Sequence, residues 1–486
     1  MVVSNRLPVA IDLDEAGRPV VQAGTGGLIT ALEPIVRKSK GIWIGWPGCT
    51  VDHKVTETLQ EYGSNVPHEL VPVAITQEEV QGFYRGYSNK TIWPLFHDLL
   101  GQFSFDLESF ETYQTVNERF AQVVAQNVLP EDTCWIHDYQ LILVGYYLRR
   151  LGGHGQLNYF LHIPFPSLDL LRRLPRNEEI MNAFLAYDHL GFQTAADRRN
   201  FISCVKWIIP QARVTTRKRQ ATVHYDGRDV IVGYYPISID FDEFNSGAAS
   251  QNANNAAWYL RENLTIETLA LGLDRLDYTK GIRERFLAFE RLLQKHPEMI
   301  GQISLLQIVV PSRLNVAEYV DLKRGLDFEA GRINSVYSQH GWVPILYEFR
   351  TLTREQLLGH YKAADIALIT PLRDGMNLVS KEFCASCTDE NGVLILSRFA
   401  GAAAQLGKGA LLVNPFDYDE IADAIFAACV MPREEKRERM RVLRSEIRRN
   451  NGHRWVRWFF DEKSPNMPVS PVIESASTEM HVKKDY

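Results

Sequence analysis

The chain has few cysteines, no excess of positive charge and no apolar run long enough to span a bilayer. Its six cysteines among 486 residues are too sparse for a disulfide framework and fit a reducing cytoplasm. A formal net charge of −6 argues against a general nucleic-acid-binding protein. The N-terminus has no basic segment followed by an apolar core, so we expect no signal peptide. We therefore expect a cytoplasmic protein whose partners are small-molecule substrates, without nucleic acid or membrane. Self-association into a homo-oligomer is left open.

Two short motifs have spacings that metal sites use, but we interpret both otherwise. Cys384 and Cys387 form a C-x-x-C inside a predicted helix, without the second ligand pair that a zinc site needs. Asp12 and Asp14 form a D-x-D, which we interpret as solvated surface in a flexible loop. We therefore expect no metal and no cofactor.

Short apolar runs alternate with helical patterns along most of the chain. We predict helices at 282–296 and 353–364; the second opens with Thr353 followed by Gln356, a capping-box signature. Alternation over this length predicts an α/β fold with doubly wound parallel sheets of the Rossmann kind. The predicted strands are 1–7, 41–46, 132–138, 157–165, 188–194, 229–239, 268–276, 303–311, 364–370, 392–397 and 410–415.

The polar stretch 240–258 follows one predicted strand series and precedes another, so we expect the domain boundary there. This divides the chain into an N-terminal domain, 1–240, and a C-terminal domain, 241–450. We expect a helix at 451–463 to pack back on the N-terminal domain. The Pro- and Ser-rich tail, 464–486, is expected to be disordered.

The stretch "PLRDGMNLVSKE" (371–382) reads as a turn from a strand into a helix. Such turns lie at the carboxyl ends of parallel strands, where ligands bind. A helix that starts near Asn377 would present the free backbone N–H groups of Asn377, Leu378 and Val379, and Gly375 would allow close approach. This arrangement favours an anion such as a diphosphate.

Two acids flank this helix start. Glu382 lies four residues after Leu378, on the same helix face, and could accept hydrogen bonds from a diol near the phosphate. Asp374, in the turn, could bind a second polyol. A capped helix with surface acids explains the same residues equally well.

Cations and polar groups follow several other predicted strands. Arg275 and Lys280, in "LDRLDYTKG", could neutralise a diphosphate leaving group, and the apolar surroundings of Arg275 favour this over a solvated surface. Arg6 and Arg313 could bind a second phosphate or form ordinary salt bridges. The glycine-rich "GTGGL" (24–28) could cradle an anion, but this signal alone is weak.

Asp138 and His162 end successive predicted strands, so both could point into a cleft. Asp138 could act as a base or accept a hydrogen bond from a hydroxyl, and His162 could form a hydrogen bond with a sugar hydroxyl. The alternative for His162 is a core histidine whose ring nitrogens are hydrogen-bonded within the protein. Tyr84 and Trp93 are expected on an aromatic lip that suits stacking on sugar faces.

Taken together, these segments resemble the trehalose-phosphate synthase family of retaining glycosyltransferases, from "VVSNR" to "HRWVRWFFDE". The resemblance implies the GT-B architecture, in which two Rossmann-like doubly wound domains face a central cleft. The motifs that carry it are "SNRLP", "WIGWPG", "SNKTIWPLFH", "WIHDYQL", "FLHIPFPS", "RLDYTKG", "AGRIN", "TPLRDGMNLVSKE" and "LSRFAGAAAQL".

The resemblance also implies roles for individual residues. The nucleotide-sugar donor site would comprise Gly26, Gly27, Arg275, Lys280, Asp374, Gly375, Met376, Asn377, Leu378, Val379 and Glu382, with Glu382 on the ribose and Asp374 on the donor sugar. The acceptor site would comprise Arg6, Trp46, Tyr84, Trp93, Asp138 and Arg313. Trp93 and His162 would lie beside the reacting anomeric centre, and the catalytic group would be His162, Arg275, Lys280 and Asp374.

The implied reaction moves glucose from a nucleotide-glucose, expected to be UDP-glucose, to glucose 6-phosphate, giving α,α-trehalose 6-phosphate. It would retain configuration without a covalent intermediate and without a metal. The alternatives are a glucosylglycerol-phosphate synthase or related pseudo-glycosyltransferase, and, in a different class, a non-catalytic sugar-phosphate sensor. The base of the donor cannot be read from the sequence.

Overall fold

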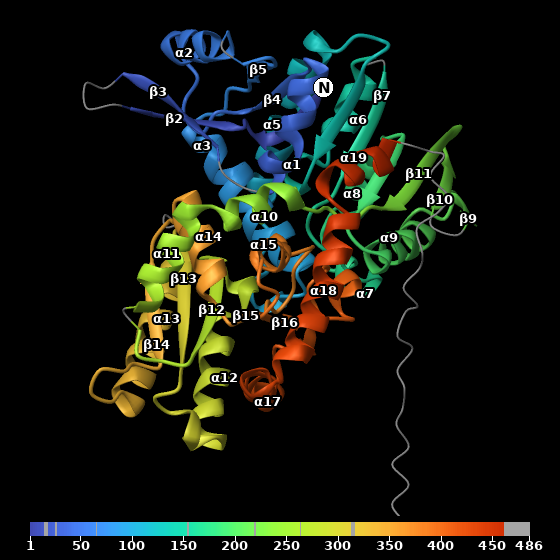
Figure 1. The fold of residues 1–486 in the computed structure, drawn as a ribbon. Helices are drawn as coiled ribbons and strands as arrows, with labels where there is room; N and C mark the ends of the chain where they lie inside the picture. The colour runs from blue at the N-terminus through green and yellow to red at the C-terminus, as the bar shows by residue number, and fades with distance from the viewer. Residues whose placement is uncertain are drawn as a thin grey trace, which may run out of the picture.

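The computed structural model describes residues 1–13, 18–24, 27–64, 66–152, 155–217, 220–262, 264–312 and 316–460 (Figure 1). Its framework is two sheets, one from each half of the chain, and a separate hairpin of β2 (Val9–Leu13) and β3 (Pro19–Ala23). Parallel strands joined by helices build most of both sheets. The predicted α/β class is confirmed.

The N-terminal sheet has nine strands in the described residues, and its neighbours are parallel from β5 to β11 and antiparallel beyond. In order across the sheet they are β5 (Glu69–Pro72), β4 (Ile42–Trp46), β1 (Val2–Arg6), β6 (Thr133–His137), β7 (Gln156–Phe160), β8 (His189–Phe192), β11 (Arg228–Tyr234), β10 (Gln220–Tyr225) and β9 (Arg213–Arg217).

The C-terminal sheet has six strands in the same described part of the chain, and every neighbouring pair is parallel. Their order is β14 (Ile345–Phe349), β13 (Ile303–Val310), β12 (Thr268–Arg275), β15 (Ile366–Ile369), β16 (Val393–Ser397) and β17 (Leu411–Val413).

Helices connect the strands and cover the sheets. The α-helices are α1 (Gly27–Ser39), α2 (His53–Gly63), α3 (Gln77–Glu79), α4 (Trp93–Phe96), α5 (Leu107–Asn127), α6 (Val144–Arg150), α7 (Leu168–Leu171), α8 (Asn177–Phe184), α9 (Ala195–Ile208), α10 (Phe241–Ala249), α11 (Gln251–Glu262), α12 (Ile282–Lys295), α13 (Ala317–Tyr337), α14 (Arg354–Ala363), α15 (Leu378–Ser386), α16 (Ala403–Leu406), α17 (Tyr418–Val430), α18 (Arg433–Arg449) and α19 (Gly452–Phe460). A π-helix, η1 (Val80–Ile92), precedes α4, and short 3₁₀ turns are Leu100–Gln102, Tyr139–Leu141, Tyr278–Lys280 and Pro297–Met299.

Local signals in the sequence explain several element boundaries. The capping box predicted at Thr353 is present at the start of α14. The strand predicted at 229–239 ends earlier, at Tyr234, because Pro236 has no N–H to donate to a ladder. Asp12 lies in β2, paired with Val20, so its expected place in a loop is wrong. Its D-x-D partner Asp14 lies outside the described residues.

One of the three buried hydrophobic clusters in the described residues is built from both halves, so the halves share part of their core. The polar stretch expected at the boundary forms α10 and α11, which pack on α15 and α14. At the C-terminal end, α19 returns to the N-terminal sheet: Figure 1 shows it beside the strands of that sheet, and Trp135 packs on Trp455 and Phe459 with ring centroids 5.1 and 4.6 Å apart. We propose that the domains are 1–240 and 241–450, with 451–463 attached to the first.

Candidate active site

The start of α15 has the features of an anion-binding site. The chain leaves β15 at Ile369 and enters α15 at Leu378 and Val379, with Asn377 as the N-cap. The Asn377 side chain accepts a 3.0 Å hydrogen bond from the Ser380 N–H, and its φ of 75° turns the backbone into the helix. The first N–H groups of a helix have no partner inside it, and the helix dipole favours negative charge there. The helix start expected near Asn377 is confirmed.

Lys280 and Asp374 form an ion pair beside this helix start. Lys280 Nζ lies 2.6 Å from Asp374 Oδ2, and only 10% and 13% of the two side chains are exposed. Asn377 Nδ2 donates to the same oxygen at 3.2 Å. Burial disfavours a charged Asp374, but Lys280 and Asn377 outweigh burial and hold the pKa of this carboxyl below its usual value. Three of the predicted donor residues therefore lie together, with the lysine already paired to a carboxylate.

A buried arginine supports the turn that carries Arg275 and Lys280. Arg285 is fully buried and donates to Asp274 Oδ2 at 2.6 Å and to the Lys280 carbonyl at 3.3 Å. These contacts fix the end of β12 relative to the start of α12. Arg285 was not among the predicted residues, although it lies at a core position of the predicted 282–296 helix.

Asp138 and His162 meet at the carboxyl ends of β6 and β7, as the sequence predicts. The backbone N–H of His162 donates a hydrogen bond to Asp138 Oδ1 at 3.2 Å. Asp138 has a φ of 72°, a left-handed conformation that costs energy for a non-glycine residue and that is concentrated at functional sites. Burial raises the pKa of Asp138 to about 6, against the opposing effects of backbone N–H groups and of the Arg275 charge. Arg275, from the other sheet, thus lies within electrostatic reach of Asp138.

The His162 imidazole is neutral and has a neighbour at each nitrogen. Nε2 lies 3.0 Å from His137 Nδ1, and Nδ1 lies 3.4 Å from Gln193 Nε2. Burial lowers the pKa of His162 to about 3, so the ring carries no charge at neutral pH. With both ring nitrogens occupied by neighbours, the ring could bond a sugar hydroxyl only by giving up one of these contacts, and it cannot stabilise a leaving anion by its charge.

Arg6, Trp46 and Tyr84 gather at the carboxyl ends of β1 and β4. The Arg6 guanidinium lies over the Trp46 ring, 4.2 Å from its centroid, and within electrostatic reach of the Tyr84 hydroxyl. Gly48, with a φ of 97°, leaves room for this guanidinium, because a Cβ there would collide with it. Trp46 is buried and Arg6 is exposed, so the cation is held by stacking yet open to a ligand.

Trp93 does not lie on an exposed lip, and this expectation is wrong. It is 5% exposed and packs against His97 and Tyr139, with ring centroids 4.2 and 5.4 Å away. His97, which sequence analysis missed, is buried with Nδ1 2.7 Å from the Trp93 carbonyl oxygen, and burial lowers its pKa to about 4. His97 lies within electrostatic reach of Lys280 and Asp374, so this part of the N-terminal half lies near the predicted donor residues.

The two halves touch where the predicted donor loops lie. A Cβ added to Gly375 would collide with the backbone of His162, and one added to Gly27 would collide with the Leu378 side chain. Lys381 Nζ donates 2.6 Å to the Ile237 carbonyl, which ties α15 to the segment after β11. The carboxyl-end loops of the two sheets therefore face one another.

The remaining predicted residues lie on α15, in the turn before it or outside the described part of the chain. The Tyr361 hydroxyl donates to Glu382 Oε2 at 2.7 Å, and burial raises the pKa of Glu382. Met376 is 3% exposed and packs in the shared core. Gly26 and Arg313 lie outside the described residues, so their assignments stay predictions.

In the described ranges, no group of three or more His, Cys, Asp or Glu side chains could hold a metal ion. Cys384 and Cys387 are both buried, at α15 and its C-cap. None of the described helices combines the length and the apolar character that a membrane crossing requires.

Two Rossmann-like sheets have facing carboxyl ends, with an anion-binding helix start on one and a stacked arginine on the other. This is the GT-B architecture. The chain belongs to glycosyltransferase family 20, whose family model matches residues 1–464.

Individual relatives are similar over nearly the whole chain. A trehalose-6-phosphate synthase from Mycolicibacterium vanbaalenii is 38% identical over 478 residues, which cover 96% of this chain and 96% of the relative. The crystal structure of an α,α-trehalose-phosphate synthase (UDP-forming) from Burkholderia xenovorans, in complex with glucose-6-phosphate, has a TM-score of 0.84 and 34% identity and covers 94% of this chain and 98% of its own. A structure from E. coli, bound with UDP-2-fluoro glucose, has a TM-score of 0.82 and 33% identity, with coverages of 94% and 98%.

Proposed function

We propose that this chain transfers glucose from UDP-glucose to glucose 6-phosphate, releasing UDP and forming α,α-trehalose 6-phosphate with retention of configuration. The observation that carries the proposal is the junction between the sheets, where Gly375 lies against the His162 backbone and Gly27 lies against the Leu378 side chain. A donor held at the start of α15 and an acceptor held near Arg6 would meet at this junction. Whole-chain similarity to a structure with glucose-6-phosphate and to one with UDP-2-fluoro glucose supports the choice of substrates.

On the donor side, we assign the diphosphate to Arg275, Lys280 and the first N–H groups of α15. We assign Gly27 to the same diphosphate, because it already lies against the α15 start. Gly26 is assigned with it on the family resemblance alone. Lys280 would share its charge between the diphosphate and Asp374, its present partner. The ribose would bind Glu382 and the donor sugar Asp374, while Gly375, Met376 and Asn377 shape the turn.

On the acceptor side, we assign the phosphate to Arg6 and Arg313, with Trp46 and Tyr84 enclosing the sugar. Asp138 would accept a sugar hydroxyl, and its pKa of about 6 leaves it largely ionised at neutral pH. Trp93 and His162 would border the reacting carbon. Trp93 would do so as part of a rigid wall, because it is buried.

The chemistry requires positioning and stabilisation of the leaving group. The acceptor hydroxyl at C1 of glucose 6-phosphate attacks C1 of the donor glucose on the face from which UDP departs. The C1–O bond to UDP breaks, its electron pair stays with the diphosphate, and a diphosphate oxygen takes the acceptor proton. Arg275, Lys280 and the helix N–H groups hold the growing negative charge. A retaining glycosidase would instead need two carboxylates about 5 Å apart.

Metal independence, a cytoplasmic location and small-molecule partners without nucleic acid or membrane are part of the same proposal. Self-association is compatible with it.

The proposal is tested by measuring nucleoside diphosphate released from UDP-glucose and GDP-glucose. Each donor is combined with glucose 6-phosphate, glycerol 3-phosphate or no acceptor, with and without EDTA. We expect release from UDP-glucose only with glucose 6-phosphate, unchanged by EDTA. Release with glycerol 3-phosphate instead would assign the neighbouring transferase activity, and binding of both substrates without release would assign a sensor. Loss of UDP release in EDTA would contradict only the proposed metal independence and not the choice of substrates.

A further inference from the structure

A cavity of about 500 Å³ lies at the amino-terminal edge of the N-terminal sheet, among α6, α8 and the turn between β10 and β11. Asp188, just before β8, and Arg228, the first residue of β11, mark this edge. Asp138 and His162 follow the opposite, carboxyl ends of β6 and β7. The cavity is therefore separate from the candidate active site, at the other end of the same sheet.

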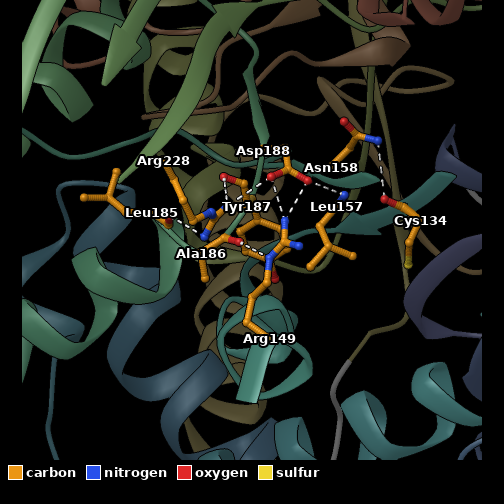
Figure 2. A network of polar contacts seen from close by, with 9 residues as sticks. All are labelled: Cys134, Arg149, Leu157, Asn158, Leu185, Ala186, Tyr187, Asp188 and Arg228. Carbon is orange, nitrogen blue, oxygen red and sulfur yellow. Dashed lines mark hydrogen bonds and ion pairs between the residues drawn. The ribbon is translucent and has the colours of Figure 1, made fainter. Parts of the chain in front are cut away.

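The cavity wall is held by a fixed polar network (Figure 2). Arg149 donates to both carboxylate oxygens of Asp188, at 2.6 and 2.7 Å, and Arg228 donates to Oδ1 at 3.0 Å. Both arginines also donate to backbone carbonyls, Arg149 to Ala186 at 3.2 Å and Arg228 to Tyr187 at 3.2 Å. Figure 2 shows both guanidinium groups converging on the one carboxylate. Hydrogen-bond donors held in this way need little reordering when a ligand arrives.

The charges around the cavity are separated and close to balance. Arg149 and Arg228 share the single carboxylate of Asp188. Arg150 and Asp226 line the cavity, and neither forms an ion pair within the described residues. A cluster of unpaired cations would suit a phosphate, whereas separate donors and acceptors suit hydroxyl groups, which both donate and accept.

Aromatic and amide groups complete the wall. Tyr146 and Tyr147 pack edge to face with ring centroids 5.4 Å apart, and the Arg150 guanidinium lies 5.7 Å from the Tyr146 centroid. Tyr225 is half-buried and lines the cavity, so its ring offers an apolar face to a ligand. Asn182 adds an amide whose Oδ1 has no hydrogen-bond partner among the described residues. A sugar site needs aromatic rings that pack on the C–H faces of the sugar and fixed polar groups that bind its hydroxyls. Small-molecule sites usually span roughly 300–1,000 Å³, which includes this cavity.

We propose that this cavity is a second, non-catalytic site that binds a neutral sugar of one or two pyranose rings. The hydroxyls bond with Arg149, Arg228 and Asp226, and a sugar face packs on Tyr225. The proposal does not depend on which nucleotide sugar or acceptor the active site uses.

The test is ligand-observed saturation-transfer NMR with trehalose as the probe and saturating UDP present. The cavity variants are Tyr225→Ala and Asp226→Asn; asparagine tolerates the left-handed backbone that Asp226 adopts, with φ of 50°. Trp258→Ala, which removes an exposed aromatic ring on α11, is the matched control. UDP release under standard assay conditions shows that each variant is folded.

We expect wild-type protein and Trp258→Ala to bind trehalose, and each cavity variant to bind it about tenfold more weakly with unchanged kcat. No trehalose signal from wild-type protein at about 10 mM sugar would overturn the proposal. Equal signals from wild type and both cavity variants would also overturn it, because the sugar would then lie elsewhere. A signal from glucose 6-phosphate that Arg150→Ala abolishes, without any from trehalose, would overturn it in favour of an anion site.

Discussion

Replacing Gly375 by alanine should misalign the donor loop without removing any functional group. The added Cβ would overlap the His162 carbonyl oxygen and lie 3.0 Å from its carbon and 3.1 Å from Ile163 Cα. These are backbone atoms that cannot rotate aside, so the donor turn or the His162 segment must move by about 1 Å. A misplacement of about 1 Å can cost about 100-fold in rate. We therefore expect kcat/KM for UDP-glucose to fall about 100-fold.

The assay is the initial rate of UDP release as each substrate is varied, below the melting temperature of the variant, because overpacking also costs about 1–3 kcal/mol of stability. Gly325→Ala is the matched control. Gly325 lies inside α13, and an added Cβ there meets no atom within 4 Å, so we expect an unchanged rate and a slightly more stable protein. A folded Gly375→Ala protein with kcat/KM within about twofold of the unsubstituted enzyme would refute the claim that the two loops meet in the active state.

Three further outcomes follow from the buried groups. Arg285→Met should lower the free energy of unfolding by about 3–5 kcal/mol, because Asp274 would stay buried without its cation; an unchanged urea midpoint would contradict this. Glu382→Gln should raise the KM for UDP-glucose about tenfold and leave that for glucose 6-phosphate unchanged; equal changes would exclude the ribose assignment. Burial lowers the pKa of His97 to about 4 and of His162 to about 3, so below about pH 6.5 the unfolded chain binds protons that the native state cannot. Each of these two histidines should lower the free energy of unfolding by about 1.4 kcal/mol per pH unit as the pH falls from about 6.5 to its folded pKa. A melting temperature that stays constant from about pH 7 to pH 5 would exclude this pH dependence.

Most strands of the parallel sheets could be predicted because each is a short, buried apolar run between helical patterns. The edge strands β5 (Glu69–Pro72) and β14 (Ile345–Phe349) were missed, because most of their residues are only partly buried and the runs are less apolar. The antiparallel strands β10 and β9 at the edge of the N-terminal sheet could not be predicted. β9 (Arg213–Arg217), for example, is an exposed, polar edge strand with little apolar signal. The hairpin of β2 and β3 was missed for a similar reason, because its strands are short and the sequence between them is polar.

The candidate site could be predicted where a polar residue directly follows a strand. Asp138 and His162 are brought together in this way, since adjacent parallel strands end at the same edge. Contacts between the halves could not be predicted, because periodicity carries no information about which loops of two sheets meet. His97 and Arg285 were missed because a buried histidine or arginine in an apolar segment looks the same in sequence whether it supports a site or only the core.

The most direct test of the central claim is the NMR spectrum of the product formed from UDP-[1-¹³C]glucose and glucose 6-phosphate. We expect one labelled anomeric carbon with α configuration, joined to C1 of the acceptor, whose phosphate stays on C6. A β-configured carbon, a linkage to any other acceptor hydroxyl, or labelled free glucose as the only product would contradict it.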